Sequence, residues 1–148
     1  FFFISFKNDT LEMDKSDNFR DIRFTNPYKK YLYLDYISST KGRTKGYLVE
    51  LNTQGNLALY KKEAITYYAG KKARTSQESD IPASYTTVSY FYFFKTKAGN
   101  IISFPNSKKG LIKLYPDKKS EIESFLKQNK ISFDDEEDMK KIIGFLAQ

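Results

Sequence analysis

The chain has 148 residues, of which 40% are hydrophobic and 29% are charged, a balance typical of one globular domain rather than of a disordered segment. It carries 25 basic and 18 acidic side chains, a formal net charge of +7, and it has no histidine and no cysteine. These two absences exclude disulfide scaffolds, thiol nucleophiles, Cys/His zinc sites and Ser-His-Asp triads.

The first part of the chain predicts short strands separated by polar segments. Ile22 and Phe24 alternate with polar neighbours, which is the period of a half-buried strand. Strands are expected at Phe1–Phe6, Asp21–Thr25 and Tyr31–Ile37. A polar loop, a turn and a flexible connection are expected at Lys7–Asn18, Asn26-Pro27 and Ser38–Gly46, in that order.

The middle of the chain predicts two hairpins with a long polar segment between them. The link Asn52–Asn56 has a glycine near its end, as hairpin loops of this length often do. Strands are expected at Tyr47–Leu51, at Leu57–Tyr60 with a continuation toward Tyr68, at Tyr85–Lys95 and at Ile101–Phe104. Gly70–Ser84 contains Pro82 and no apolar period, so it is expected to form a mobile loop.

The hydrophobic period then changes to that of helices. Short helices are expected at Ser107–Tyr115 and from an N-cap at Asp117 to about Asn129. A last helix is expected after an N-cap at Asp134, with Glu137 at the capping-box position. Its apolar residues fall on one stripe, namely Met139, Ile142, Ile143 and Leu146. The order indicates a single α+β domain over 1–148, with an antiparallel β-sheet of hairpins followed by two or three packed helices. Because the chain does not begin with Met, we expect its N-terminus to be truncated or processed.

The strand at Tyr85–Lys95 supplies the candidate binding residues. One of its faces presents Tyr85, and the other presents Tyr90 and Tyr92. Helices can cover one face of such a strand, so the other face must be covered by a second layer or exposed as an aromatic platform. Tyr85, Tyr90 and Tyr92 are therefore the candidates for ligand binding, and core packing is the competing interpretation of the same aromatic residues.

Motifs for catalysis and metal binding are weak. Ser38-Ser39-Thr40-Lys41 fits the S-x-x-K pattern, in which a lysine activates a serine, but the other motifs of those hydrolases are missing or out of order. The acidic run from Asp134 to Asp138 lacks the spacing of a calcium loop and is typical of a helix start. The sequence therefore predicts no catalytic residue, no metal site and no cofactor.

The net charge invites a nucleic-acid interpretation that its distribution weakens. Only Arg20, Arg23, Arg43 and Arg74 are arginines, and the lysines are scattered in pairs along the chain. Scattered lysines are typical of a solvated surface, whereas nucleic-acid sites favour arginine. A single-stranded nucleic-acid-binding module stays as an alternative to a binding domain for protein or glycan, and a small hydrolase using carboxylates or the Ser38–Lys41 pair stays as a second alternative.

Several segments of the last two thirds of the chain carry a resemblance. These are Gly46–Leu51, Leu59–Lys62, Leu114–Lys118, Lys127–Lys130 and Glu136–Asp138. With this pattern the chain resembles uncharacterised exported proteins of Gram-negative bacteria. The resemblance implies an envelope, periplasmic or secreted location and a non-catalytic role, and it brings no catalytic residue. The longest apolar run near the start, Phe1–Ile4, is too short to span a membrane.

Overall fold

The computed structural model describes residues 3–6, 9–12, 19–75 and 77–148. β1 (Phe3–Phe6) forms a small antiparallel hairpin with β2 (Asp9–Glu12). The prediction of a polar loop at Lys7–Asn18 is therefore wrong over Asp9–Glu12, because backbone pairing with β1 makes a strand of a segment whose side chains show no apolar alternation. The rest of that predicted loop, and the predicted strand residues 1 and 2, lie outside the described residues.

The main sheet has six strands in the order β10-β9-β6-β5-β4-β3, and every neighbouring pair in that order is antiparallel. The strands are β3 (Asp21–Thr25), β4 (Tyr28–Ser38), β5 (Gly42–Gln54), β6 (Leu57–Ala64), β9 (Ser89–Lys95) and β10 (Ile101–Ser103). A parallel pairing of Ile102 with Ile37 joins β10 back to β4. Five strands thus form a closed ring. The sixth strand, β3, pairs with the first residues of β4 (28–32).

The turn between β4 and β5 is tighter than the sequence predicts. Ser38–Gly46 was expected to be a flexible connection, but Ser38 pairs with Gly42 and Leu34 pairs with Gly46 across one continuous hairpin. Gly42 has a φ of +68°, a left-handed conformation that glycine adopts without a steric penalty. The glycine therefore closes the hairpin, and its polar neighbours belong to paired strands.

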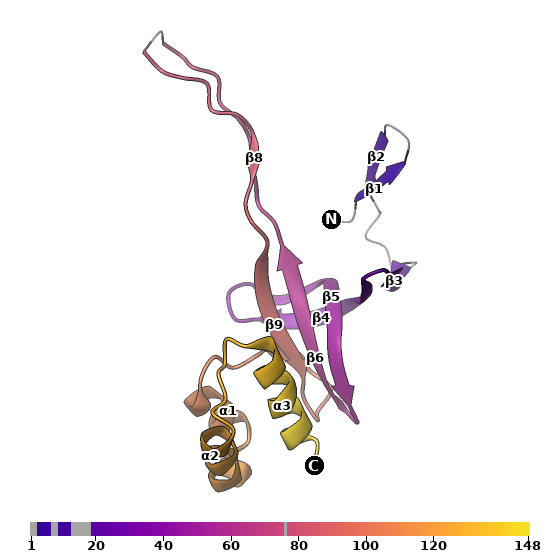
Figure 1. Ribbon diagram of the computed structural model, residues 1–148, viewed down its shortest axis with the longest axis vertical. Helices are drawn as coiled ribbons and strands as arrows, with labels where there is room; N and C mark the ends of the chain where they lie inside the picture. The colour runs from indigo at the N-terminus through magenta and orange to yellow at the C-terminus, as the bar shows by residue number, and fades with distance from the viewer. Residues whose placement is uncertain (1–2, 7–8, 13–18, 76) are drawn as a thin grey trace.

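The ring has an apolar interior and an apolar outer face under the helices. Along β6, Ala58 and Tyr60 point into the ring, whereas Leu57 and Leu59 point outward to the helices. The helices are α1 (Lys108–Leu114), α2 (Lys119–Gln128) and α3 (Glu136–Leu146), and they gather at one end of the sheet (Figure 1). The expected stripe of α3 is confirmed, since all four of its apolar residues are buried against the sheet. The predicted α+β class is confirmed as well.

Two predicted helix caps are wrong by small shifts. Asp117 lies inside a short 3₁₀ turn (Pro116–Lys118) that leads into α2, so it caps no α-helix. Asp135, not Asp134, is the N-cap of α3, and its Oδ1 accepts a hydrogen bond of 2.9 Å from the Asp138 amide. In a run of five consecutive carboxylates, only the backbone geometry distinguishes the residue that caps.

The largest departure from the predicted elements is a projecting hairpin, which we call the arm and define as residues 65–88. Tyr67–Tyr68 (β7) pairs with Ser84–Tyr85 (β8), and Lys71 pairs with Ile81 further out. The arm continues from β6 and returns into β9, and it extends away from the end of the sheet that carries the helices (Figure 1). The prediction of a loop at Gly70–Ser84 is wrong where Lys71 pairs with Ile81 and where Ser84 pairs with Tyr68, whereas the other described residues of this segment belong to no strand.

Candidate binding surface

The three tyrosines predicted to bind a ligand occupy different environments along one stretch of chain. Tyr85 lies in the arm and is 70% exposed, and Tyr90 at the start of β9 is 54% exposed. Tyr92 is partly buried against α3, and the next residues, Phe93 and Phe94, are buried in the two cores. Exposure therefore changes along the strand, from the arm to the six-stranded sheet and its three helices, which we call the body, rather than from one face of the strand to the other.

Tyr92 connects the sheet to the last helix. Its hydroxyl donates a hydrogen bond of 3.3 Å to Oε2 of Glu136, the carboxylate that also pairs with Lys61 at 2.8 Å. Burial, together with the nearby Glu136 charge, raises the pKa of the Tyr92 phenol. Tyr92 thus has a complete structural role in the body, and the two tyrosines before it are the ones exposed to solvent.

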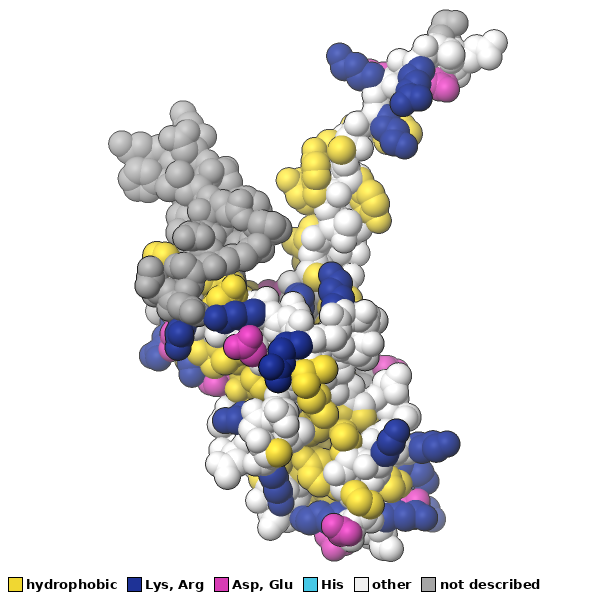
Figure 2. All heavy atoms as spheres, turned by 180° about the vertical axis from the view of Figure 1, so that it is seen from behind, with side chains coloured by type: hydrophobic (Ala, Val, Ile, Leu, Met, Phe, Trp, Pro, Cys, Tyr) yellow, Lys and Arg dark blue, Asp and Glu magenta, His cyan; other side chains and the backbone are white. Residues whose placement is uncertain are grey.

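The inner part of the arm, which we call the stem (residues 65–70 and 82–88), is rich in exposed tyrosine. The rings of Tyr67 and Tyr85 pair across the two strands with centroids 5.0 Å apart, and Tyr68 lies on the opposite face because successive side chains alternate. All three are more than half exposed. Apolar side chains follow this part of the arm in the space-filling view (Figure 2). Nothing in the sequence singles out Tyr67 and Tyr68 as binding residues, because their pairing with Ser84 and Tyr85 spans a segment with the composition of a loop.

Glycine and threonine hold the two strands of the arm together. A Cβ on Gly70 would lie 2.7 Å from the Ala83 amide nitrogen and 2.7 Å from the Ile81 carbonyl oxygen, so only glycine lets the strands approach this closely. Beyond it, Lys71 and Ile81 exchange two backbone hydrogen bonds of 2.8 Å. Near the body, the Thr66 amide donates to the Thr86 hydroxyl at 2.9 Å. These bonds give the arm a defined ribbon structure.

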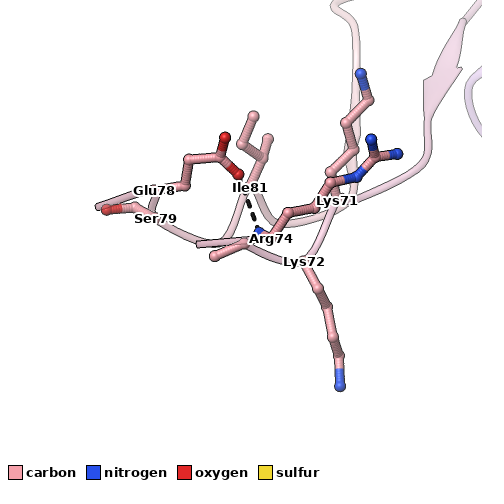
Figure 3. Close-up of a pocket in the computed structure, with 7 residues that line it drawn as sticks. Lys71, Lys72, Arg74, Glu78, Ser79 and Ile81 are labelled. Carbon is pink, nitrogen blue, oxygen red and sulfur yellow. Dashed lines mark hydrogen bonds between the residues drawn. The ribbon is translucent and has the colours of Figure 1, made fainter. Parts of the chain in front are cut away.

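The end of the arm, which we call the tip (residues 71–75 and 77–81), is basic and hollowed. Its concave side is lined by Lys71, Lys72, Ala73, Arg74, Glu78, Ser79 and Ile81 (Figure 3). The two carboxylates of the tip bind backbone amides: Asp80 accepts from Ala73 at 2.7 Å, and Glu78 accepts from Arg74 at 3.0 Å. Within the described part of the chain, no ion pair involves the side chains of the three cations.

A polar cluster fixes β6 just before the arm begins. The Glu63 carboxylate accepts hydrogen bonds from Lys29 Nζ at 2.8 Å and from the Tyr31 hydroxyl at 2.6 Å. Burial alone would raise the pKa of Glu63, but these two bonds outweigh it and lower that pKa. Burial and the hydrogen bond to Glu63 raise the pKa of Tyr31 to about 12. The arm therefore starts from a strand whose end is anchored to β4.

The candidate catalytic groups are not brought together. Ser38 lies at the end of β4, where its hydroxyl contacts the Thr40 hydroxyl at 3.1 Å and accepts from the Thr40 amide at 3.3 Å. Among the described residues, no hydrogen bond joins Ser38 to Lys41. No group of three or more acidic side chains in the same part of the chain is placed to hold a metal ion. No helix of the described chain is long and apolar enough to cross a membrane.

Comparisons with known proteins leave the site to be interpreted from its own geometry. No family model, no curated protein and no solved structure matches the chain. The resemblance to exported proteins and the location that it implies therefore stay predictions.

Proposed function

We propose that the chain is a non-catalytic binding domain that holds a partner protein through its arm. The observation that carries this proposal is the exposure of Tyr67, Tyr68 and Tyr85 on a ribbon that projects from a body with two buried cores of its own. Tyrosine offers a large contact area at a low cost in conformational entropy, and it is enriched among the residues that dominate binding energy. The exported location implied by the resemblance belongs to the same proposal.

The division between body and arm supports this role energetically. The body buries complete side chains such as Phe94 and Ile143, so its stability does not depend on the arm. The stem instead exposes apolar side chains that include Ile65 and Val88 as well as the tyrosines. Contiguous exposed apolar surface of this kind marks interaction sites, because a partner that covers it gains the free energy of its burial.

A protein partner suits the arm better than a glycan. A sugar ring stacks on one aromatic face beside convergent polar groups, whereas the stem has tyrosines on both faces and uncharged side chains between them. A two-stranded ribbon also has two outer edges, each with backbone groups that can pair with another strand. These are the features that polypeptide partners use in strand addition.

Site-specific photo-cross-linking in the producing cells tests the proposal. A benzophenone amino acid at Tyr85 is expected to give discrete adducts with a partner protein. The matched control is the same substitution at Tyr28, a tyrosine in β4 with 69% exposure, against 70% for Tyr85. Equal adduct patterns at the two positions, or no adduct at either, would contradict a binding role of the arm.

A further inference from the structure

We infer that the partner of the arm is an extended acidic polypeptide segment, which pairs with the stem as an added strand and places its carboxylates at the tip. This inference rests on the proposed function of the arm and adds the chemistry of its partner. The positive charges of Lys71, Lys72 and Arg74 indicate an acidic partner. The edge of the stem at residues 65–70 indicates that this partner binds as a strand.

The tip presents its positive charge without internal compensation. Asp80 and Glu78 accept hydrogen bonds from the backbone amides of Ala73 and Arg74, so neither carboxylate neutralises a cationic side chain. Figure 3 shows the side chains of Lys71 and Arg74 extending to one side of the tip and that of Lys72 to the other. Three lysines outside the arm, Lys29, Lys30 and Lys61, instead each pair with a glutamate within 3.0 Å. Cations without an acidic partner on both sides of the tip favour an anionic ligand.

The net charge disfavours a second copy of the chain as that occupant. Each copy carries a net charge of +7, so two copies repel one another at long range. A segment of opposite sign is attracted over the same distances, and its arrival is faster. The charge complementarity therefore points to an acidic partner.

The stem indicates how such a segment would bind. Each strand of the β7–β8 ribbon pairs on one side only within the described chain, so its other side is an outer edge. Pro82 lacks an amide proton and interrupts the edge of the returning strand, whereas residues 65–70 contain no proline. A strand added along residues 65–70 would form backbone hydrogen bonds there, and its apolar side chains would lie against Tyr67 on one face and Tyr68 on the other.

The distribution of charge separates this partner from a nucleic acid and from a lipid surface. The sequence has no charged residue at positions 64–70 or 81–94, so the stem cannot pair with a phosphate at every nucleotide. At a lipid surface, aromatic rings lie deeper than the cations that contact the headgroups. The arm has the reverse order, with its cations at the far end and its rings behind them (Figure 2).

Selection of short random peptides on the whole chain tests the inference. We expect enriched peptides to combine a cluster of Asp or Glu with alternating apolar residues. Synthetic versions are then measured by fluorescence anisotropy against a stem variant (Tyr67→Ser/Tyr85→Ser), a tip variant and a control. The tip variant is Lys71→Glu/Lys72→Glu/Arg74→Glu, and the control makes the same charge change on exposed helix lysines, Lys109→Glu/Lys113→Glu/Lys119→Glu.

The tip variant is expected to bind the peptides at least about tenfold more weakly, because the attraction between peptide carboxylates and the cations of the tip is replaced by repulsion. The control is expected to change binding by less than about threefold, through the net charge alone. Peptides that need the stem but are not acidic, or that bind the tip variant as well as the unchanged chain, would refute the inference and leave the proposed function standing.

Two further outcomes would contradict the inference. Peptides that ignore both the stem and tip variants would refute the proposed function together with the inference. Tip-dependent binding of oligo(dT) or of phosphatidylserine vesicles that is tighter than binding of the selected peptides would replace the acidic polypeptide by a nucleic acid or a membrane as the partner.

Discussion

Removing the Tyr85 ring is expected to leave the stability of the fold nearly unchanged. Tyr85 is 70% exposed, and its ring contact is the cross-strand pair with Tyr67. Such pairs contribute roughly 0.2–1 kcal/mol, so Tyr85→Ala should lower the free energy of unfolding by less than about 1 kcal/mol. The same substitution is expected to weaken binding of a partner through the arm, because the ring is part of the proposed contact surface.

The matched substitution is Phe94→Ala, in the buried part of β9. Phe94 is fully buried between the sheet and the helices, so Phe94→Ala removes a complete ring from the core and should cost about 3–5 kcal/mol. Tyr92→Phe is intermediate, since it removes only the hydrogen bond to Glu136 and should cost about 1 kcal/mol. Stability should thus become more sensitive to substitution with distance from the arm.

Urea denaturation followed by circular dichroism measures all three costs. The midpoint should shift little for Tyr85→Ala and most for Phe94→Ala, with similar slopes. If Phe94→Ala does not fold, the graded comparison is made between Tyr85→Ala and Tyr92→Phe. A cost above about 2 kcal/mol for Tyr85→Ala would refute the reasoning, because an exposed ring of this kind cannot contribute that much. The arm would then pack on another surface in solution.

Three other predictions follow from local geometry. Gly70→Ala should separate the strands of the outer arm, which amide hydrogen exchange would detect as faster exchange there with unchanged protection in the body, and equal protection throughout would contradict the close approach. Asp135→Ala should lower stability by about 1 kcal/mol in thermal unfolding and Asp134→Ala should have little effect, so the reverse order would contradict the observed cap. Because the pKa of Glu63 is lowered, its carboxylate stabilises the fold above pH 4.5 and this contribution is lost as the pH falls through the lowered value. Glu63→Gln should therefore cost about 1–2 kcal/mol at pH 7 and much less in acid, whereas an equal cost at both pH values would contradict the ionised hydrogen bonds.

Elements that bury one face were predictable from the sequence. The stripe of α3 repeats at the helical period because those residues, such as Ile142 and Ile143, face the sheet continuously. The hairpin around Gly55 was predictable for a similar reason, since its strands alternate between the interior of the ring and the helix-covered face. In the helix and in the hairpin, apolar residues recur in the sequence at the same period as the buried positions of the structure.

The arm and the closure of the ring left no such pattern. A ribbon that buries neither face needs no apolar period, so the segment around the bridge of Lys71 with Ile81 has the composition of a loop although these two residues pair. The closure depends on one parallel pairing between Ile37 and Ile102, residues too far apart in the sequence for local patterns to connect them. Tyr85 was a candidate because it lies in an aromatic segment predicted to be a strand. Its exposure was not predictable, because it depends on the residue at which the chain leaves the six-stranded sheet.

The meaning of the positive charge depends on what the neighbouring carboxylates bind. On the body, Glu63 and Glu136 each form an ion pair with a lysine, so the charges of those two lysines are neutralised within the fold. At the tip, the carboxylates of Glu78 and Asp80 cap backbone amides, and they shape the turn without neutralising the cations around it. A net charge of +7 was weak evidence for any partner because it counts paired and unpaired cations alike. The cations of the arm are evidence for an anionic partner because the backbone, rather than the cations, binds the nearby acids.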